Sequence, residues 1–142
     1  MSQALPDAQE NDAVDLRVPC KAEWVALVRL SVAAFASRLN FSLDEIADIK
    51  LAVAEACTNC IQHAQGSAHI EIRCVNQGDG LRVSVRDYGR GTRVEQIRSR
   101  DLDEERAGGL GVFLIRSLMD EVAYDVHPDH GTHLTMFKRL QQ

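Results

Sequence analysis

The sequence lacks any long apolar run, and no stretch approaches the roughly 18 residues that a membrane-spanning helix needs. It also lacks an excess of positive charge, since 16 Lys and Arg against 21 Asp and Glu give a formal net charge of -5. Direct binding to nucleic acid is therefore not expected. The acidic N-terminus has no basic start of the kind that opens a signal peptide. We expect a cytoplasmic protein with no membrane association.

Internal repeats, low-complexity segments and the two commonest nucleotide-binding motifs are also missing. The chain has neither a Walker loop G-x-x-x-x-G-K-[ST] nor a strand-linked G-x-G-x-x-G followed by a ribose-binding acid. Its 142 residues suit one domain with a real core. Residues 1–13 are polar and acidic without hydrophobic periodicity, which predicts a disordered leader. Residues 14–142 predict the single domain.

The four cysteines permit two interpretations, a metal-binding set or buried apolar residues. They are Cys20, Cys57, Cys60 and Cys74. Cys57 and Cys60 lie one turn apart on the apolar side of a predicted helix, where reduced cysteines are typically buried. We interpret the cysteines as small buried side chains.

The chain is organised around residues 48–64, which read DIKLAVAEACTNCIQHA. At helical spacing, Ile49, Val53 and Cys57 fall on one face, while Glu55 and Asn59 fall on the other. Four residues apart, this carboxylate and this carboxamide lie one above the other. They suit a site in which one moves a proton and the other coordinates a hard cation. A merely solvated polar face is the alternative.

Before this helix, alternating Val14, Leu16 and Val18 predict an edge strand that ends at Pro19. Residues 21–39 then show helical spacing of apolar side chains. Arg29 stands among those apolar neighbours, either as a surface arginine or as the polar anchor of a surface for partners. Ser42 with Glu45 forms a capping box, so the organising helix should begin there and run to about residue 64.

After this helix, two alternating segments predict a hairpin. Ile70, Ile72 and Cys74 lie on one face of its first strand, and Leu81, Val83 and Val85 on one face of its second. Continuing the second series places Asp87 on the covered face where the strand ends. A buried carboxylate needs a partner.

Glycines mark the segments that follow. Residues 87–91 read DYGRG, and residues 92–109 are rich in Arg, Asp and Glu, which predicts a mobile lid with at most a short helix. Residues 108–122, GGLGVFLIRSLMDEV, lead from glycines into an apolar helix, whose first N–H groups are free to hold an anion. Strands are predicted around Tyr124 and over residues 131–138, which begin with Gly-Thr.

The order of these motifs is more specific than any one of them. In order, the chain has an E-x-x-x-N helix, a strand ending in D-x-G-x-G, a polar lid, a G-x-G opening a helix and a G-T opening the last strand. This order resembles the Bergerat ATP-binding fold of gyrase and histidine kinases. Within that fold, the motif segments are most similar to the anti-sigma-factor serine/threonine kinases. These segments are AVAEACTNCIQHA, DYGRG, GGLGVFLIRSLMDEV and GTHLTMFKR. The resemblance runs from about Val14 to Arg139.

The resemblance implies an α/β (α+β) two-layer sandwich, with a mixed, mainly antiparallel sheet and helices on one face. ATP would lie between the helix of Glu55 and the lid. Asn59 would hold Mg²⁺ against the triphosphate, and Glu55 would act as the catalytic carboxylate beside the γ-phosphate. The other residues implied to bind ATP are Asp87 and Thr132 at the adenine, Gly89 and Gly91 at the pocket floor, and Gly109 and Gly111 at the phosphates.

The chain departs from the family pattern in places. Its lid is a few residues shorter, and Thr92 replaces a proline. Arg106 is close to the position of a phosphate-contacting arginine, but Gly108 shifts the register, so its role stays open. His63 matches a common family histidine, for which we favour a packing or helix-end role over a proton shuttle.

Two functions follow from the resemblance. The first is an ATP-dependent serine kinase that binds a sigma factor and phosphorylates a small STAS-type anti-anti-sigma protein. The second is a nucleotide-gated binding module with little or no transferase activity. A histidine kinase domain is a weaker third reading, because no upstream helix with a phosphoacceptor histidine is present. The resemblance also implies a homodimer, and the helix of Arg29 is our candidate for partner and dimer contacts.

Overall fold

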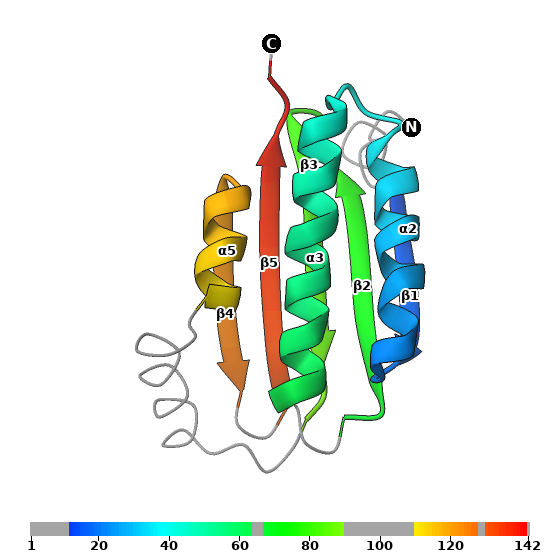
Figure 1. The fold of residues 1–142 in the computed structure, drawn as a ribbon, viewed down its shortest axis with the longest axis vertical. Helices are drawn as coiled ribbons and strands as arrows, with labels where there is room; N and C mark the ends of the chain where they lie inside the picture. The colour runs from blue at the N-terminus through cyan, green and yellow to red at the C-terminus, as the bar shows by residue number, and fades with distance from the viewer. Residues whose placement is uncertain (1–11, 64–66, 90–109, 128–129, 142) are drawn as a thin grey trace, which may run out of the picture.

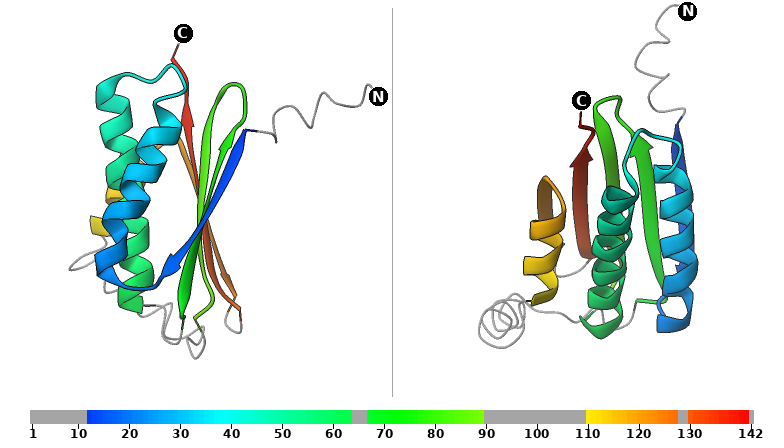
Figure 2. Two further views of the ribbon diagram at one scale, coloured as in Figure 1. Left: turned by 90° about the vertical axis from the view of Figure 1, so that its right-hand side faces the viewer. Right: turned by 45° about the horizontal axis from the view of Figure 1, so that its top comes forward.

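The computed structural model describes residues 12–63, 67–89, 110–127 and 130–141. These residues form two layers, in which α2, α3 and α5 cover one face of a five-stranded sheet (Figures 1 and 2). The left view of Figure 2 shows the helices on one side of the sheet and its other face uncovered. The two-layer α+β architecture implied by the sequence is therefore confirmed.

The elements follow in the order β1 (Ala13–Pro19), η1 (Ala22–Trp24), α2 (Val25–Ala36), α3 (Leu43–His63), β2 (His69–Asn76), β3 (Gly80–Asp87), α5 (Leu110–Leu118), β4 (Glu121–His127) and β5 (Gly131–Arg139). In space the strand order is β1-β2-β3-β5-β4. Every pairing among these described strands is antiparallel. The parallel component that a mixed sheet requires is not found in them.

The predicted alternation of the central hairpin is confirmed. Ile72 of β2 pairs with Val85 of β3, and Cys74 pairs with Val83. All four side chains are buried against the helices. Cys57 and Cys60 of α3 are buried in the same core, so the interpretation of the cysteines as buried side chains holds for Cys57, Cys60 and Cys74, while Cys20 is half-buried.

The helix predicted over residues 21–39 is shorter than expected. Its start is the 3₁₀ turn η1, and the α-helical part ends at Ala36. Its core side consists of Val28, Val32 and Ala36, which are fully buried. The apolar pattern was right, but hydrophobic spacing does not distinguish an α-helical end from the tighter turns that precede and follow α2.

The capping box at the start of α3 is confirmed. The Glu45 amide donates to Ser42 Oγ at 3.1 Å, and the Ser42 amide donates to Glu45 Oε1 at 2.8 Å. Two N–H groups that the helix leaves without an intrahelical partner are thereby satisfied. The reciprocal pair fixes where α3 begins, and with it the turn at which each later residue of the helix lies.

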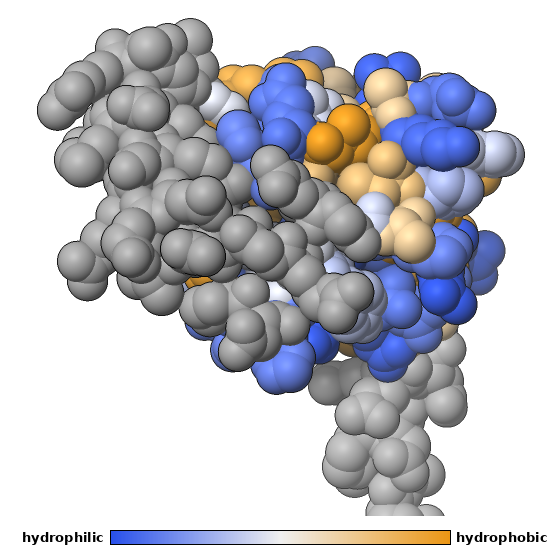
Figure 3. Space-filling model, turned by 90° about the horizontal axis from the view of Figure 1, so that it is seen from below, coloured by the Kyte–Doolittle hydropathy of each residue, from blue (hydrophilic) through white to orange (hydrophobic). Residues whose placement is uncertain are grey.

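The strand β1 begins at Ala13, one residue before the expected start of the domain. Most of the expected leader, residues 1–11, lies outside the described part of the chain, as does the whole predicted lid over residues 92–109. No helix among the described residues is long and apolar enough to cross a membrane. Figure 3 views the molecule from the end where α3 and β3 finish, and most of the described surface there is hydrophilic around a small apolar area.

Candidate functional site

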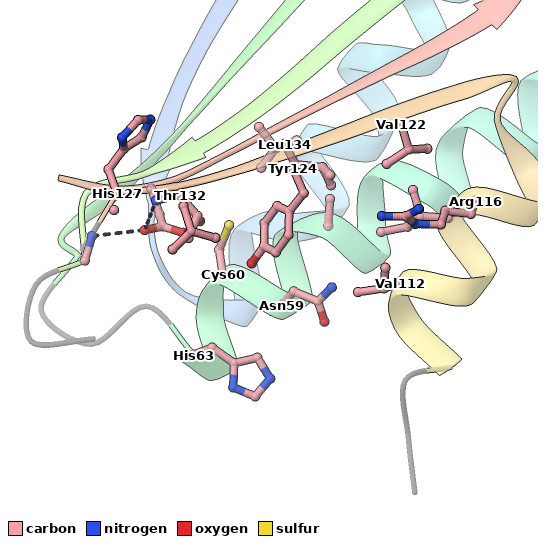
Figure 4. Close-up of a pocket in the computed structure, with 17 residues that line it drawn as sticks. Asn59, Cys60, His63, Val112, Arg116, Val122, Tyr124, His127, Thr132 and Leu134 are labelled. Carbon is pink, nitrogen blue, oxygen red and sulfur yellow. Dashed lines mark hydrogen bonds between the residues drawn. The ribbon is translucent and has the colours of Figure 1, made fainter. Parts of the chain in front are cut away.

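A pocket lies between α3, α5 and the strands β3, β5 and β4. Its wall is largely apolar, with Ala56, Val85, Ile115, Val122 and Leu134 among the lining residues. A few polar side chains also line it, among them Asn59, Asp87 and Thr132 (Figure 4). A mainly apolar pocket with a few convergent polar groups is typical of small-molecule and cofactor sites.

At one end of the pocket lies Asp87, the one buried charged side chain among the described residues, with 2% of its surface exposed. Its Oδ1 accepts hydrogen bonds from the Gly89 amide at 3.0 Å and from the Thr132 amide at 3.2 Å. The Thr132 hydroxyl donates to Oδ2. The inward position predicted for Asp87 is confirmed. The structure brings Asp87, Gly89 and Thr132 together, although Thr132 is 45 residues away in the sequence.

Gly131 is a residue of this site that the sequence did not single out. Its φ is +91°, and a Cβ atom there would lie 2.1 Å from the Asp87 carbonyl oxygen and 2.8 Å from Asp87 Oδ1. Only a residue without a side chain allows β5 to approach Asp87 so closely. The Gly-Thr pair at the start of the last strand was the available signal, but we assigned a role to its threonine alone.

Cys60 lines the same end of the pocket and interacts with Asp87. Burial is the main cause that raises the pKa of its thiol well above the ordinary value, followed by the negative charge of Asp87 and by the Cys57 thiol. The thiol is therefore protonated at neutral pH, and it is not a nucleophile.

At the other end of the site, Glu55 and Asn59 face the first turn of α5. A Cβ atom placed on Gly111 would lie 3.3 Å from Asn59 Oδ1 and 3.5 Å from Glu55 Oε2. Both α3 side chains are half-buried. The pair predicted from sequence thus lies beside the predicted glycine-rich start of α5, and it is not a solvated face far from other elements.

This arrangement suits a bound phosphate with a cation. The first amides of α5, like those of any helix, have no intrahelical acceptor, and the helix dipole adds positive potential there. A carboxamide oxygen beside these amides is an oxygen ligand of the kind that Mg²⁺ prefers, and Mg²⁺ usually takes one or two protein ligands together with substrate phosphates and water. The donor set of Asn59 and Glu55 therefore fits the ion implied by the resemblance.

Some predicted site residues cannot be placed. Gly91 and Gly109 lie outside the described residues, together with Thr92 and Arg106. Their roles stay predictions. His63 lies at the end of α3 and lines the pocket, a position consistent with the helix-end role favoured from sequence.

Tyr124 and Arg116 line the pocket without having been predicted to do so. Figure 4 shows the Tyr124 ring entering from β4 and Arg116 extending from α5. The alternation of Val122, Tyr124 and Val126 was visible in the sequence, but the position of β4 beyond β5 was not. Without the strand order, the side chains of β4 could not be assigned to this pocket.

Arg29 lies away from the pocket. It is exposed on α2, which flanks α3 on the side opposite to α5 (Figure 1). Its neighbours in sequence Leu27 and Leu30 are 45% and 64% exposed. The structure thus separates the nucleotide-site candidates from the candidate for partner contacts.

The chain is similar to several known proteins. The family model described as "Histidine kinase-like ATPase domain" matches residues 18–138. Proteins named serine-protein kinase RsbW are similar over most of their length. The protein from Listeria monocytogenes serovar 1/2a is 38% identical, with 95% of this chain and 92% of the relative covered. The protein from Halalkalibacterium halodurans is 37% identical, with 92% and 85% covered.

Among solved structures, the chain resembles a crystal structure of the RsbU and RsbW domains of a Mycobacterium tuberculosis protein. The TM-score is 0.67 at 18% identity, and the match covers 90% of this chain and 32% of that one. At this level of identity the likeness is one of fold. It independently supports the two-layer architecture described above.

Proposed function

Because the chain belongs to the histidine kinase-like ATPase domain family, as one of its RsbW-type serine-protein kinases, we propose that it is an anti-sigma factor. In this proposal it binds a sigma factor, and it uses ATP with Mg²⁺ to phosphorylate a STAS-type anti-anti-sigma protein on serine. The observation that carries the proposal is the meeting of Glu55 and Asn59 with Gly111 at the start of α5. A sigma factor as partner implies a cytoplasmic protein.

In this proposal Asp87 selects the base. Its carboxylate accepts a hydrogen bond from the amino group of adenine, while Thr132, Gly89 and Gly131 hold it in place. Guanine has a carbonyl oxygen where adenine has this amino group, so it would face a buried carboxylate without donating to it. Leaving such an acceptor unpaired costs about 1–3 kcal/mol. The apolar side chains Val85 and Leu134 flank the base.

At the phosphate end, Asn59 would hold Mg²⁺ by its side-chain oxygen, and the backbone amides of Gly109 and Gly111 would contact the phosphates. When bound, the ion neutralises negative charge on the triphosphate. Gly91 would contribute with Gly89 to the floor of the pocket. The role of the protein in phosphoryl transfer is mainly to position the reactants and to stabilise charge.

Glu55 is the proposed general base. Its carboxylate accepts the proton of the incoming serine hydroxyl as the serine oxygen bonds to the γ-phosphorus. The bond from this phosphorus to the β–γ bridging oxygen breaks, and ADP leaves. Glu55 and Asn59 lie one helical turn apart on α3, so the base and the metal ligand are fixed relative to each other by the helix itself.

The alternative is a nucleotide-gated binding module without transferase activity. Incubation with radiolabelled ATP, Mg²⁺ and a small STAS-type protein that binds this chain distinguishes the two. We expect label on a serine of that protein. If the chain binds Mg·ATP and the STAS-type protein but transfers no label within hours, the module reading is correct and the kinase proposal fails.

For the partners we propose the exposed side of α2. Arg29 is exposed on this helix, which also exposes Leu27 and Leu30, and Trp24 just before the helix is 38% exposed. Arginine and large apolar side chains are enriched at interface centres, and the planar fork of arginine binds carboxylates in two places. The same helix is our candidate for contacts in a homodimer. Co-purification of a sigma factor and of the STAS-type protein with wild type but not with Arg29→Glu tests this surface, with Arg38→Glu as a matched charge reversal beyond α2.

A further inference from the structure

Tyr88 lies between two residues of the proposed base-reading site, and its side chain points away from both. β3 ends at Asp87, which is buried, and Gly89, whose amide donates to Asp87 Oδ1 at 3.0 Å, is buried as well. Tyr88 between them is 41% exposed. Because successive side chains of a strand point to opposite faces, the Tyr88 ring belongs to the face of the sheet that the helices leave uncovered (Figure 2, left view).

On that face the Tyr88 side chain contacts two neighbouring strands. Its hydroxyl donates to Glu71 Oε1 of β2 at 2.6 Å, and the Arg86 guanidinium of β3 lies 5.0 Å from the centre of its ring. Glu71 and Arg86 are opposite each other in the pairing of β2 with β3, and both are half-buried. The hydrogen bond to Glu71 is the main cause that raises the pKa of the Tyr88 hydroxyl above its ordinary value, so the hydroxyl remains a donor at neutral pH.

The backbone of Tyr88 is held as well. Its amide lies beyond the end of β3 and donates to Ser67 Oγ at 3.0 Å, and the Ser67 hydroxyl donates in turn to the His69 carbonyl oxygen at 2.7 Å. Ser67 thus connects the start of β2 to the residue after Asp87. Two side-chain contacts and one amide contact therefore hold Tyr88 where the chain leaves the sheet.

The conformation of Tyr88 determines how Asp87 and Gly89 meet. The Gly89 amide reaches back over two residues to Asp87 Oδ1, and the direction of this amide depends on the backbone dihedral angles of Tyr88. If Tyr88 turned, the Gly89 amide would leave Asp87, and the carboxylate would lose a donor that fixes its orientation. A carboxylate that is already oriented binds a base more tightly, because ordering it on binding costs affinity.

We infer that Tyr88 is a positioning residue for the recognition of adenine, which holds the turn of residues 87–89 in place from the uncovered face of the sheet through Glu71 and Arg86. The inference deepens the proposed function and rests on the reading of adenine by Asp87. Tyr88 does not line the pocket, so it acts through Asp87 and not by contact with the nucleotide. It has no part in the transfer of the phosphate, which takes place at the other end of the pocket.

The test is calorimetric titration of Tyr88→Phe with Mg·ATP and with Mg·inosine triphosphate, which has a carbonyl oxygen in place of the adenine amino group. Phenylalanine keeps the ring beside Arg86 and loses only the hydrogen bond to Glu71. We expect the Kd for ATP to rise about three- to tenfold, as for the loss of one hydrogen bond. The Kd for inosine triphosphate, and the transfer rate at saturating Mg·ATP, should stay within about twofold of wild type.

The same hydrogen bond can be removed from its other side. Glu71→Ala lacks the acceptor and should raise the Kd for ATP as Tyr88→Phe does. Glu71→Gln keeps an oxygen acceptor for the hydroxyl and should bind ATP like wild type. Because both residues act through one bond, the double variant of Tyr88→Phe with Glu71→Ala should bind ATP no more weakly than either single variant.

Asp15→Ala is the matched control, because it breaks the ion pair of 2.7 Å with Arg73 on the same uncovered face, between β1 and β2. It should leave both Kd values at those of wild type. The inference is refuted if Tyr88→Phe binds ATP like wild type. It is also refuted if Tyr88→Phe shifts the two nucleotides equally, since an equal shift reports the shape of the pocket or the stability of the fold and not the position of Asp87.

Asp87→Asn separates this inference from the function on which it rests. If Asp87→Asn leaves the ratio of the two Kd values unchanged, Asp87 does not read adenine, and both ideas fail. If that ratio collapses in Asp87→Asn while Tyr88→Phe keeps the wild-type ratio, the reading of adenine stands and the positioning by Tyr88 alone fails.

Discussion

Gly131 lets β5 lie closer to Asp87, at the end of β3, than a residue with a side chain would allow. With a φ of +91° and the Asp87 backbone where a Cβ would lie, alanine there has to move either β5 or the end of β3. We expect Gly131→Ala to lower the free energy of unfolding by roughly 2 kcal/mol or more, since strain at a positive φ adds to the displaced contact. It should also weaken ATP binding, because Asp87 shifts. Urea unfolding and nucleotide titration measure the two effects.

Gly78→Ala is the control for Gly131→Ala. Gly78 also has a positive φ, 89°, but it lies in the exposed turn between β2 and β3. Its replacement should cost about 1 kcal/mol of stability and leave the Kd for ATP unchanged. Equal loss of ATP binding in the two variants would mean that general destabilisation, and not the position of Asp87, sets the affinity.

The buried thiols predict a loss of stability in alkali. Burial raises the pKa of Cys57 and of Cys74 from 9.0 to about 12, with the Cys20 thiol and the Asp15 charge as the respective lesser causes. In the unfolded chain each thiol ionises near pH 9, while in the folded chain it keeps its proton until about pH 12. The contribution of each thiol to stability is therefore complete below pH 9 and decreases between pH 9 and 12.

In that window each such thiol should lower the free energy of unfolding by up to about 1.4 kcal/mol per pH unit. Urea unfolding of wild type and of Cys74→Ala at several pH values isolates this contribution, because all other titrating groups are common to both. We expect the difference in stability between the two proteins to narrow as the pH rises above 9. A constant difference would show that the Cys74 thiol does not keep its proton in the fold.

The helix α3 has its capping box at the start, and the proposed site residues Glu55 and Asn59 lie near its end. Its capping box lies at Ser42 and Glu45, and Glu55 is 13 residues beyond Ser42, which is about 20 Å along a helix. Ser42→Ala should lower the free energy of unfolding by about 1 kcal/mol and leave the Kd for ATP unchanged. Denaturant unfolding and nucleotide titration check the two parts.

Ser42→Asp keeps an oxygen acceptor for the Glu45 amide and should be within a few tenths of a kcal/mol of wild type. If Ser42→Ala weakens ATP binding as much as it weakens the fold, the two ends of α3 are not independent. The pair Glu55 and Asn59 would then depend on how the whole helix is seated.

The elements themselves were largely predictable, because their signals are local. The capping box fixed the start of α3, and strict alternation fixed both the hairpin and the inward side of Asp87. The ends of α2 were less predictable, since the same apolar spacing continues through the 3₁₀ turn before it. Cys60 was predictable as buried, but not as a neighbour of Asp87.

For the whole molecule, the spatial order of the strands decides which side chains meet, and local patterns do not encode it. β5 lies between β3 and β4, so Thr132 reaches Asp87 while Tyr124 and Val126 line the far side of the same pocket. The sequence placed Asp87 with Thr132 by family resemblance alone. It gave no means to find Tyr124 or Arg116, whose positions in the pocket depend on contacts between distant segments.

The molecule divides its surface between the proposed nucleotide site and the proposed partner surface. The pocket lies on the α5 side of α3, and Arg29 with the exposed Leu27 and Leu30 belongs to α2 on the other side (Figure 1). The helix α3, in contact with both α2 and α5, connects the two sides.

We propose above all that Asn59 holds the Mg²⁺ of Mg·ATP and that Glu55 accepts the proton of the serine hydroxyl. The most direct test is the single-turnover rate of phosphate transfer from saturating Mg·ATP to the STAS-type protein by Glu55→Gln. We predict a rate about 10²- to 10⁴-fold below wild type, at a Kd for ATP within about threefold of wild type, as expected for a residue that acts in transfer. Transfer by Glu55→Gln at the wild-type rate would contradict it.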